Sequence, residues 1–110
     1  MAAYLLIESR DPLESTDVAG YFYELAAGLA RAGDTVSLFL VQNGVFPARH
    51  GAGSAALEAV TRAGVEVLAD DFSLRERGIT AAELAHGVQE SGINSLVDTI
   101  TQPNMKAIWH

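Results

Sequence analysis

A short motif that occurs twice, each time between a helix-like and a strand-like segment, constrains the fold of this chain most strongly. Arg31-Ala32-Gly33 precedes one apolar, β-branched segment, and Arg62-Ala63-Gly64 precedes the next, 31 residues later. In both places the glycine is typical of a helix C-terminus. A helix, a glycine and a strand repeated at this interval indicate βαβ units, which are about 30 residues long. Such units need right-handed crossovers, so the sequence predicts a parallel sheet with helices on its faces.

The strands and helices of this sheet are predicted from local patterns. Continuous apolar runs at residues 4–7, 35–41 and 65–69 indicate buried parallel strands. A first helix is expected from Ser15 or Thr16 to Gly33, with one apolar stripe on its surface. A second helix is expected over residues 54–63, after a loop at residues 45–53.

The last third of the chain allows two interpretations. Thr80 and Glu83 form a capping box, which predicts a helix over residues 80–86. Residues 88–91 then form a short strand and residues 94–101 a helix, or one interrupted helix spans residues 80–101. Pro103 ends the helix in either case. Residues 105–109 are apolar enough for a final strand.

Composition excludes several classes of protein. With 49% hydrophobic and 19% charged residues in 110 positions, we expect one folded domain over residues 1–110. The net charge of -7 argues against nucleic acid or an anionic membrane surface as a partner. No apolar run is long enough to span a membrane and the first residues do not resemble a secretory signal, so a cytoplasmic protein is expected.

The absence of cysteine removes a further set of activities. It excludes disulfides, thiolate metal sites, a nucleophilic thiol and a persulfide carrier within these 110 residues. The three histidines, at positions 50, 86 and 110, show no spacing typical of a metal site. We therefore expect neither a metal ion nor a cofactor.

Two motifs suggest chemistry, and each has a simpler structural interpretation. Asp70-Asp71 follows the third strand, where paired carboxylates could supply a general base or a metal ligand, or could cap a short helix at residues 72–76. Gly51-Ala52-Gly53-Ser54-Ala55-Ala56 fits a dinucleotide-binding fingerprint, with the aspartates about 20 residues later. However, residues 42–50 separate these glycines from the preceding strand, which favours a flexible loop at a helix start.

Three segments together resemble the DsrE/DsrF-like sulfur-relay family, which includes the TusD- and TusB-type subunits. The first is residues 36–40 followed by Asn43-Gly44-Val45. The second is residues 64–67 leading to Arg77-Gly78-Ile79. The third runs from Leu84 through Gly87-Val88 and residues 92–96 to Trp109. The resemblance covers nearly the whole chain, and it rests on the order and spacing of these segments.

This resemblance implies a three-layer α/β/α fold with a five-stranded parallel sheet, in which residues 88–91 are the fourth strand. It also implies assembly into trimers or hexamers, or with a DsrE-family partner subunit. Sulfur-carrying members have a cysteine at the end of the third strand, where this chain has Asp70. Because a carboxylate cannot form a persulfide, the resemblance implies a member without relay activity, similar to TusB-type subunits that carry an acid here.

Together these observations predict a non-catalytic, oligomeric α/β protein that binds a partner subunit or a small ligand at the carboxyl ends of its strands. The candidate residues at those ends are Ser9, Arg10, Asp11, Asn43, Gly44, Asp70, Asp71 and Arg77. We expect Arg77 to orient the two aspartates. The consecutive aromatics at 21–23 also favour self-association, since at least one must point away from the sheet. The alternative is a small enzyme, or a metal- or nucleotide-binding domain, that uses Asp70 and Asp71.

Overall fold

The computed structural model describes residues 2–52 and 54–110 and contains one five-stranded sheet. The elements follow in the order β1 (Ala3–Glu8), η1 (Val18–Tyr23), α1 (Glu24–Arg31), β2 (Thr35–Leu40), η2 (Gln42–Ala48), α2 (Ala55–Arg62), β3 (Glu66–Asp70), α3 (Asp71–Glu76), η3 (Ala81–Glu83), β4 (Val88–Ser91), α4 (Ile93–Ile100) and β5 (Met105–Trp109). Here η1 is a π-helical segment, while η2 and η3 are 3-10 helices.

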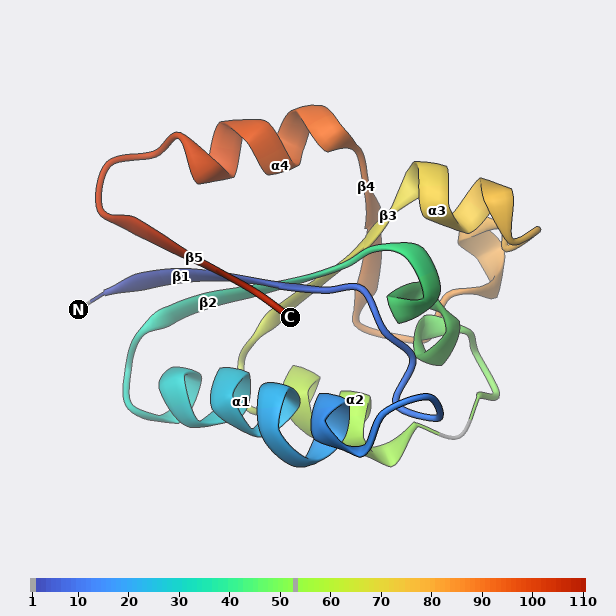
Figure 1. Cartoon of the computed structure of the whole chain (residues 1–110), viewed down its shortest axis with the longest axis horizontal. Helices are drawn as coiled ribbons and strands as arrows, with labels where there is room; N and C mark the ends of the chain where they lie inside the picture. The colour runs from blue at the N-terminus through green and yellow to red at the C-terminus, as the bar shows by residue number, and fades with distance from the viewer. Residues whose placement is uncertain (1, 53) are drawn as a thin grey trace.

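The strands lie in the order β4-β3-β2-β1-β5, and every neighbouring pair is parallel. Helices α1 and α2 lie on one side of the sheet and α4 on the other, which gives three layers (Figure 1). The prediction of a parallel sheet that contains residues 4–7, 35–41, 65–69 and the segment around Ile108 is therefore confirmed. The fold class is α/β, as expected.

The two faces of the sheet are covered to very different extents. The larger apolar cluster lies on the side of α1 and α2 and includes Phe22, Tyr23 and Leu38, all buried. The cluster on the side of α4 has four buried members, Leu5, Ile7, Phe39 and Leu96. Only Leu96 of α4 is buried, so the outward side of this helix remains apolar and exposed.

The repeated glycines end their helices as the motif predicts. Gly33 and Gly64 have φ angles of +97° and +100°, the left-handed conformation that favours glycine after a helix. Gly33 N–H bonds to the carbonyl of Ala30, and Asp34 N–H bonds to that of Leu29. These bonds complete the last turn of α1, and the chain continues directly into β2.

Three local predictions need correction. The first helix is π-helical in its first part, because the wider turn brings Val18, Phe22 and Tyr23 together onto the core. The segment 45–53 was expected to be a loop, but its first four residues, 45–48, are the second half of the 3-10 helix η2, which contains Pro47. The predicted helix at 80–86 is the single 3-10 turn η3, although the capping box between Thr80 and Glu83 is present.

The open question about the last third is settled in favour of two elements. Val88–Ser91 forms the edge strand β4, and Ile93–Ile100 forms α4, so no single helix spans this region. Gly87, which precedes β4, has a φ angle of +89°. A Cβ added to it would lie 2.6 Å from the methyl carbon of Thr61.

Within the described residues, no helix is long and apolar enough to cross a membrane.

Candidate functional site

The predicted site residues lie at the carboxyl ends of three neighbouring strands. Ser9, Arg10 and Asp11 follow β1, while Asn43 and Gly44 lie in η2, directly after β2. The third group, Asp70 and Asp71, spans the junction of β3 and α3, and Arg77 follows that helix. Because parallel strands end at the same edge, the topology brings these groups to one edge of the sheet.

Asp70 acts as the N-cap of α3. Its Oδ2 accepts hydrogen bonds from the backbone N–H of Ser73 at 2.9 Å and from the Ser73 hydroxyl at 2.6 Å. The Ser73 Oγ in turn accepts a bond from the backbone N–H of Gln42 at 2.8 Å. Asp70 is 8% exposed, and this chain of bonds links the end of β3 to the start of η2. The capping interpretation of Asp70 is thus the one that the geometry supports.

Arg77 does not contact the aspartates, which corrects the expectation that it orients them. Its Nε and Nη2 donate to Oδ1 of Asn43 at 3.1 and 2.9 Å, and its Nη1 donates to the carbonyl of Ser73 at 3.2 Å. The guanidinium also lies over the ring of Phe46, 5.7 Å from its centroid. Asp71 instead faces Arg75, one turn along α3, at 3.7 Å.

A cavity of about 520 Å³ opens where β3 and β4 end. We call it the strand-end cleft, and it is lined by Asp70, Asp71, Phe72, Arg75, Gly92, Ile93, Asn94 and Ser95. One wall therefore comes from α3 and the other from the start of α4. Gly92 lets these walls approach, since a Cβ there would lie 3.3 Å from Oδ2 of Asp71. The cleft combines one ion pair with the exposed apolar side chains of Phe72 and Ile93.

A cavity of similar size, about 560 Å³, lies along α2. Pro47, Leu57 and Val88 contribute apolar surface to it. The two arginines that line it are already engaged: Arg49 donates from Nε to the carbonyl of Phe46, and Arg62 faces Glu58 at 3.7 Å. None of the eight predicted site residues lines this cavity, whereas Asp70 and Asp71 line the strand-end cleft, so the strand-end cleft is the better candidate site.

A further group at the same sheet edge was not predicted from the sequence. We call Glu8, Asp17 and His110 the histidine cluster. Nδ1 of His110 lies 2.7 Å from Oε1 of Glu8, and its Nε2 lies 3.1 Å from Oδ2 of Asp17. The imidazole stacks on Phe22, with the two ring centroids 4.9 Å apart. Glu8 and His110 are 102 positions apart, so no local motif could reveal this contact.

Glu8 is fully buried at the end of β1, an inner strand of the sheet. Burial raises the pKa of its carboxyl, while hydrogen bonds from the backbone N–H of Arg10 and from His110 oppose the rise. The nearby hydroxyl of Tyr23 is buried without a hydrogen-bond partner, and burial together with the charges of Glu8 and Asp11 raises its pKa. Ser9 anchors the same region, since its N–H and hydroxyl both donate to the carbonyl of His110.

The described residues of the glycine-rich motif and the acidic and imidazole side chains do not form a nucleotide or metal site of the kind that was considered from the sequence. In the glycine-rich motif, Gly51 has a φ angle of +82° and Ser54 caps α2, while Gly53 lies outside the described residues. The 3-10 helix η2 separates this motif from β2, so strand does not turn directly into helix as a dinucleotide site requires. Over residues 2–52 and 54–110, no three carboxylate or imidazole side chains are placed to hold a metal ion.

Alanine at position 70 is expected to lower the free energy of unfolding by about 1–2 kcal/mol, because the N-terminus of α3 loses its cap. Alanine at the adjacent Asp71 removes only an exposed ion pair with Arg75 and should cost about 0.5 kcal/mol or less. Urea denaturation of both variants measures this difference. Equal losses for Asp70→Ala and Asp71→Ala would show that capping is not the role of Asp70.

Glu8→Gln is expected to change how stability depends on pH. Since burial raises the pKa of Glu8 above its ordinary value of 4.5, the folded protein holds this proton to higher pH than the unfolded chain does. That contribution to stability therefore falls as the pH rises. As the pH rises above 4.5, the wild type should lose stability relative to Glu8→Gln in urea denaturation. If the free energy of unfolding depended on pH in the same way for both proteins, the pKa of Glu8 would not be raised by folding.

Comparison with known proteins identifies the fold and no family. No family model matches the chain, and no curated protein matches it. The YchN protein of E. coli has a similar structure, with a TM-score of 0.82, 19% identity and full coverage of both chains. MTH1491 of Methanobacterium thermoautotrophicum, a protein of unknown function, has a TM-score of 0.75 and 21% identity over 99% of this chain and 98% of its own. At such identities the likeness concerns the fold alone.

Proposed function

We propose that this chain is a DsrE-like, non-catalytic binding subunit that assembles with further copies of itself and presents its strand-end cleft to a partner. The observation that carries this proposal is the apolar surface around α4. Ile93, Val97 and Ile100 are exposed on that helix. Phe72 and Trp109 lie on neighbouring elements, and each of these two side chains is more than 60% exposed. Large contiguous apolar surface of this kind is typical of protein interfaces.

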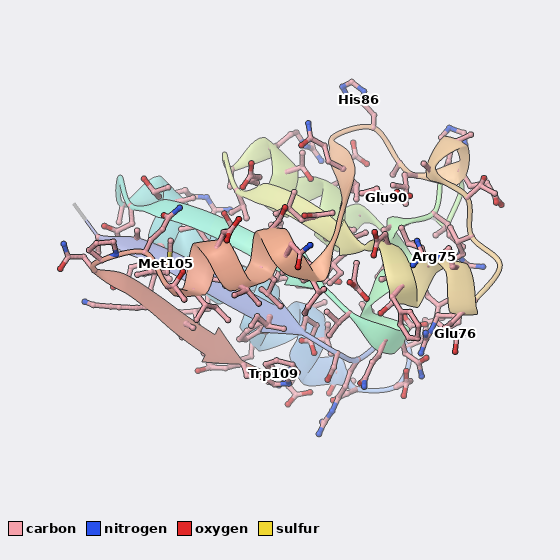
Figure 2. All side chains as sticks on the ribbon, turned by 90° about the horizontal axis from the view of Figure 1, so that it is seen from above. Arg75, Glu76, His86, Glu90, Met105 and Trp109 are labelled. Atoms are coloured by element: carbon pink, nitrogen blue, oxygen red, sulfur yellow. The ribbon has the colours of Figure 1, made fainter. Side chains whose placement is uncertain are left out.

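The position of the apolar surface fits a second copy of the chain. Among the described residues, α4 is the one helix that covers its side of the sheet, and Figure 2 shows it lying across the strands, with Trp109 at the end of β5. Another copy could supply the missing apolar layer. Phe72 and Ile93 belong both to this surface and to the strand-end cleft, so an assembly on α4 would place the cleft at or beside the interface.

The chemistry at the end of β3 supports a binding role rather than sulfur transfer. The chain has no cysteine, and Asp70 stands where sulfur-carrying members of the DsrE-like family have theirs. Its Oδ2 accepts two hydrogen bonds from Ser73 as a helix cap, which suits a structural role. We do not favour an enzyme, metal or nucleotide site built on Asp70 and Asp71, because one caps α3 and the other pairs with Arg75.

Light scattering after size exclusion tests the assembly. The wild type is expected at three or six times the 11.6 kDa of one chain. Each chain carries a net charge of -7, so assembly should strengthen when salt screens the repulsion. A mass of one chain at micromolar concentration, at both low and high salt, would refute the proposal.

Two matched variants locate the interface. Val97→Asp places a charge in the middle of the exposed face of α4 and should reduce the mass to that of one chain. Leu13→Asp changes an equally apolar residue, 92% exposed in the loop after β1, and should leave the assembly intact. Assembly that survives Val97→Asp, or that is lost in Leu13→Asp, would place the interface elsewhere.

A further inference from the structure

The histidine cluster has a property that follows from its geometry alone. Both ring nitrogens of His110 lie within hydrogen-bond distance of a carboxylate oxygen, Glu8 on one side and Asp17 on the other. Each of these contacts needs a proton between two acceptor atoms. A neutral imidazole carries one proton, so the second must reside on the ring or on a carboxyl. The arrangement therefore requires two protons shared by three groups.

We propose that the histidine cluster is a proton-dependent clasp that holds the segment after β1 against the end of β5. When the second proton is lost, one ring nitrogen presents a lone pair to a carboxylate oxygen, and that contact becomes repulsive. This loss breaks one hydrogen bond and leaves the other intact. The clasp is closed at low pH and open at high pH.

The burial of the two carboxylates decides which contact opens. Glu8 is fully buried at the end of β1, and its Oε2 accepts a hydrogen bond from the backbone N–H of Arg10 at 3.0 Å. Asp17 lies at the surface, with half of its side chain exposed, and can turn into water. The remaining ring proton therefore stays on Nδ1 toward Glu8, and the bond between Nε2 and Asp17 is released.

Several side chains surround the histidine cluster. The loop after β1 contributes the acidic Asp11, which together with Glu8 acts on the buried Tyr23 hydroxyl in η1. Tyr21 of the same segment lies beside the imidazole, with ring centroids 6.5 Å apart. The hydroxyl of Ser15 bonds to Oδ1 of Asp17, the carboxylate oxygen that does not face the imidazole. The imidazole of His110 therefore faces two carboxylates and two aromatic rings, those of Tyr21 and Phe22.

Release of Asp17 frees the start of the first helix and the loop that leads to it. Val18 N–H bonds to the carbonyl of Ser15 at 3.3 Å, directly beside the Asp17 contact. At the other end of the loop, the Ser9 N–H and hydroxyl bond to the carbonyl of His110. The loop between them, residues 9–17, is thus fastened at both ends by the region that His110 occupies.

Hydrogen exchange followed by mass spectrometry tests the clasp. After correction for intrinsic chemistry, amides in residues 9–18 should exchange at least about fivefold faster at about pH 8.5 than at about pH 5.5. Amides of α1 should keep their protection and serve as the internal reference. The increase should disappear in Asp17→Asn, in which the contact no longer depends on a proton.

Controls separate the clasp from other effects of pH. His86→Gln changes an exposed imidazole that points into solvent (Figure 2) and should keep the wild-type response. His110→Gln should abolish it; if that variant fails to fold, Asp17→Asn still decides, because Asp17 lies at the surface. The same pH response in wild type and Asp17→Asn would overturn the proposal, and so would its loss in His86→Gln. Neither outcome depends on the oligomeric state.

Discussion

Replacing Gly44 with alanine is expected to lower the free energy of unfolding by about 2–3 kcal/mol. Gly44 lies in η2, where this helix passes directly over the end of β1. A Cβ at this position would lie 2.4 Å from the carbonyl oxygen of Glu8 and 3.1 Å from its carbonyl carbon. Both are backbone atoms of β1, and that oxygen already accepts a hydrogen bond from Val41 N–H at 2.9 Å. The alanine variant can therefore fold only if η2 moves away.

Gly28→Ala is the matched control for this substitution. Gly28 lies inside α1, and no atom would lie within 4 Å of its added Cβ. Alanine should therefore stabilise the helix there, by about 0.5–1 kcal/mol. Urea denaturation of both variants gives the comparison. A Gly44→Ala protein as stable as the wild type would mean that η2 does not pack against β1 as described.

Arg77→Ala is expected to lower the free energy of unfolding by about 2–3 kcal/mol. The guanidinium makes two hydrogen bonds to Oδ1 of Asn43 and one to the carbonyl of Ser73, and it covers the ring of Phe46. Its loss removes the link between η2 and α3 and leaves the half-buried Oδ1 of Asn43 without its two hydrogen-bond donors. Lysine should not restore the stability, because a single ammonium cannot reproduce the planar fork.

Arg75→Ala provides the comparison on the same helix. Arg75 faces Asp71 at 3.7 Å, and its side chain is largely exposed, so its loss should cost about 0.5 kcal/mol or less. Chemical denaturation of Arg77→Ala, Arg77→Lys and Arg75→Ala gives the three values. If the two alanine variants lost the same stability, Arg77 would not connect η2 to α3.

The parts of the fold that depend on local rules could be predicted from the sequence. The glycines at 33 and 64 mark the ends of two helices, and the apolar runs that follow them are strands β2 and β3. The capping interpretation of Asp70 also agrees with its bonds to Ser73. In each case the signal lies within a few residues of the structure that it predicts.

The errors arose where a distant segment competes with the local pattern. The capping box at Thr80 and Glu83 starts a helix correctly, yet that helix lasts one turn. The reason is that His50 N–H bonds to the carbonyl of Glu83 and Ala85 N–H bonds to that of Ala48, so residues 83–85 pair with residues 48–50. Similarly, the glycine and proline of η2 are typical of a loop, and tertiary contacts shape them into a 3-10 helix.

The candidate residues lie at the ends of neighbouring strands, as the sequence predicts, but their contacts could not be predicted. Charge alone suggested that Arg77 would face Asp70 and Asp71, whereas it bonds to Asn43, 34 positions away. The histidine cluster was missed because its members are joined by the pairing of β5 with β1, not by spacing in the sequence. Contacts of this kind depend on strand order, which a single sequence specifies only through the whole fold.

The strand order also determines when the sheet is completed during synthesis on the ribosome. Strand β1 is made first, and one of its edges pairs with β2 soon afterwards, but the other edge pairs only with β5. Until residues 105–109 emerge, a nascent chain presents the backbone of β1 as a free edge beside the apolar side chains of Leu5 and Ile7. Free edges of this kind recruit other chains. The last strand therefore covers this edge of β1 and, with β4, forms one of the two edges of the finished sheet.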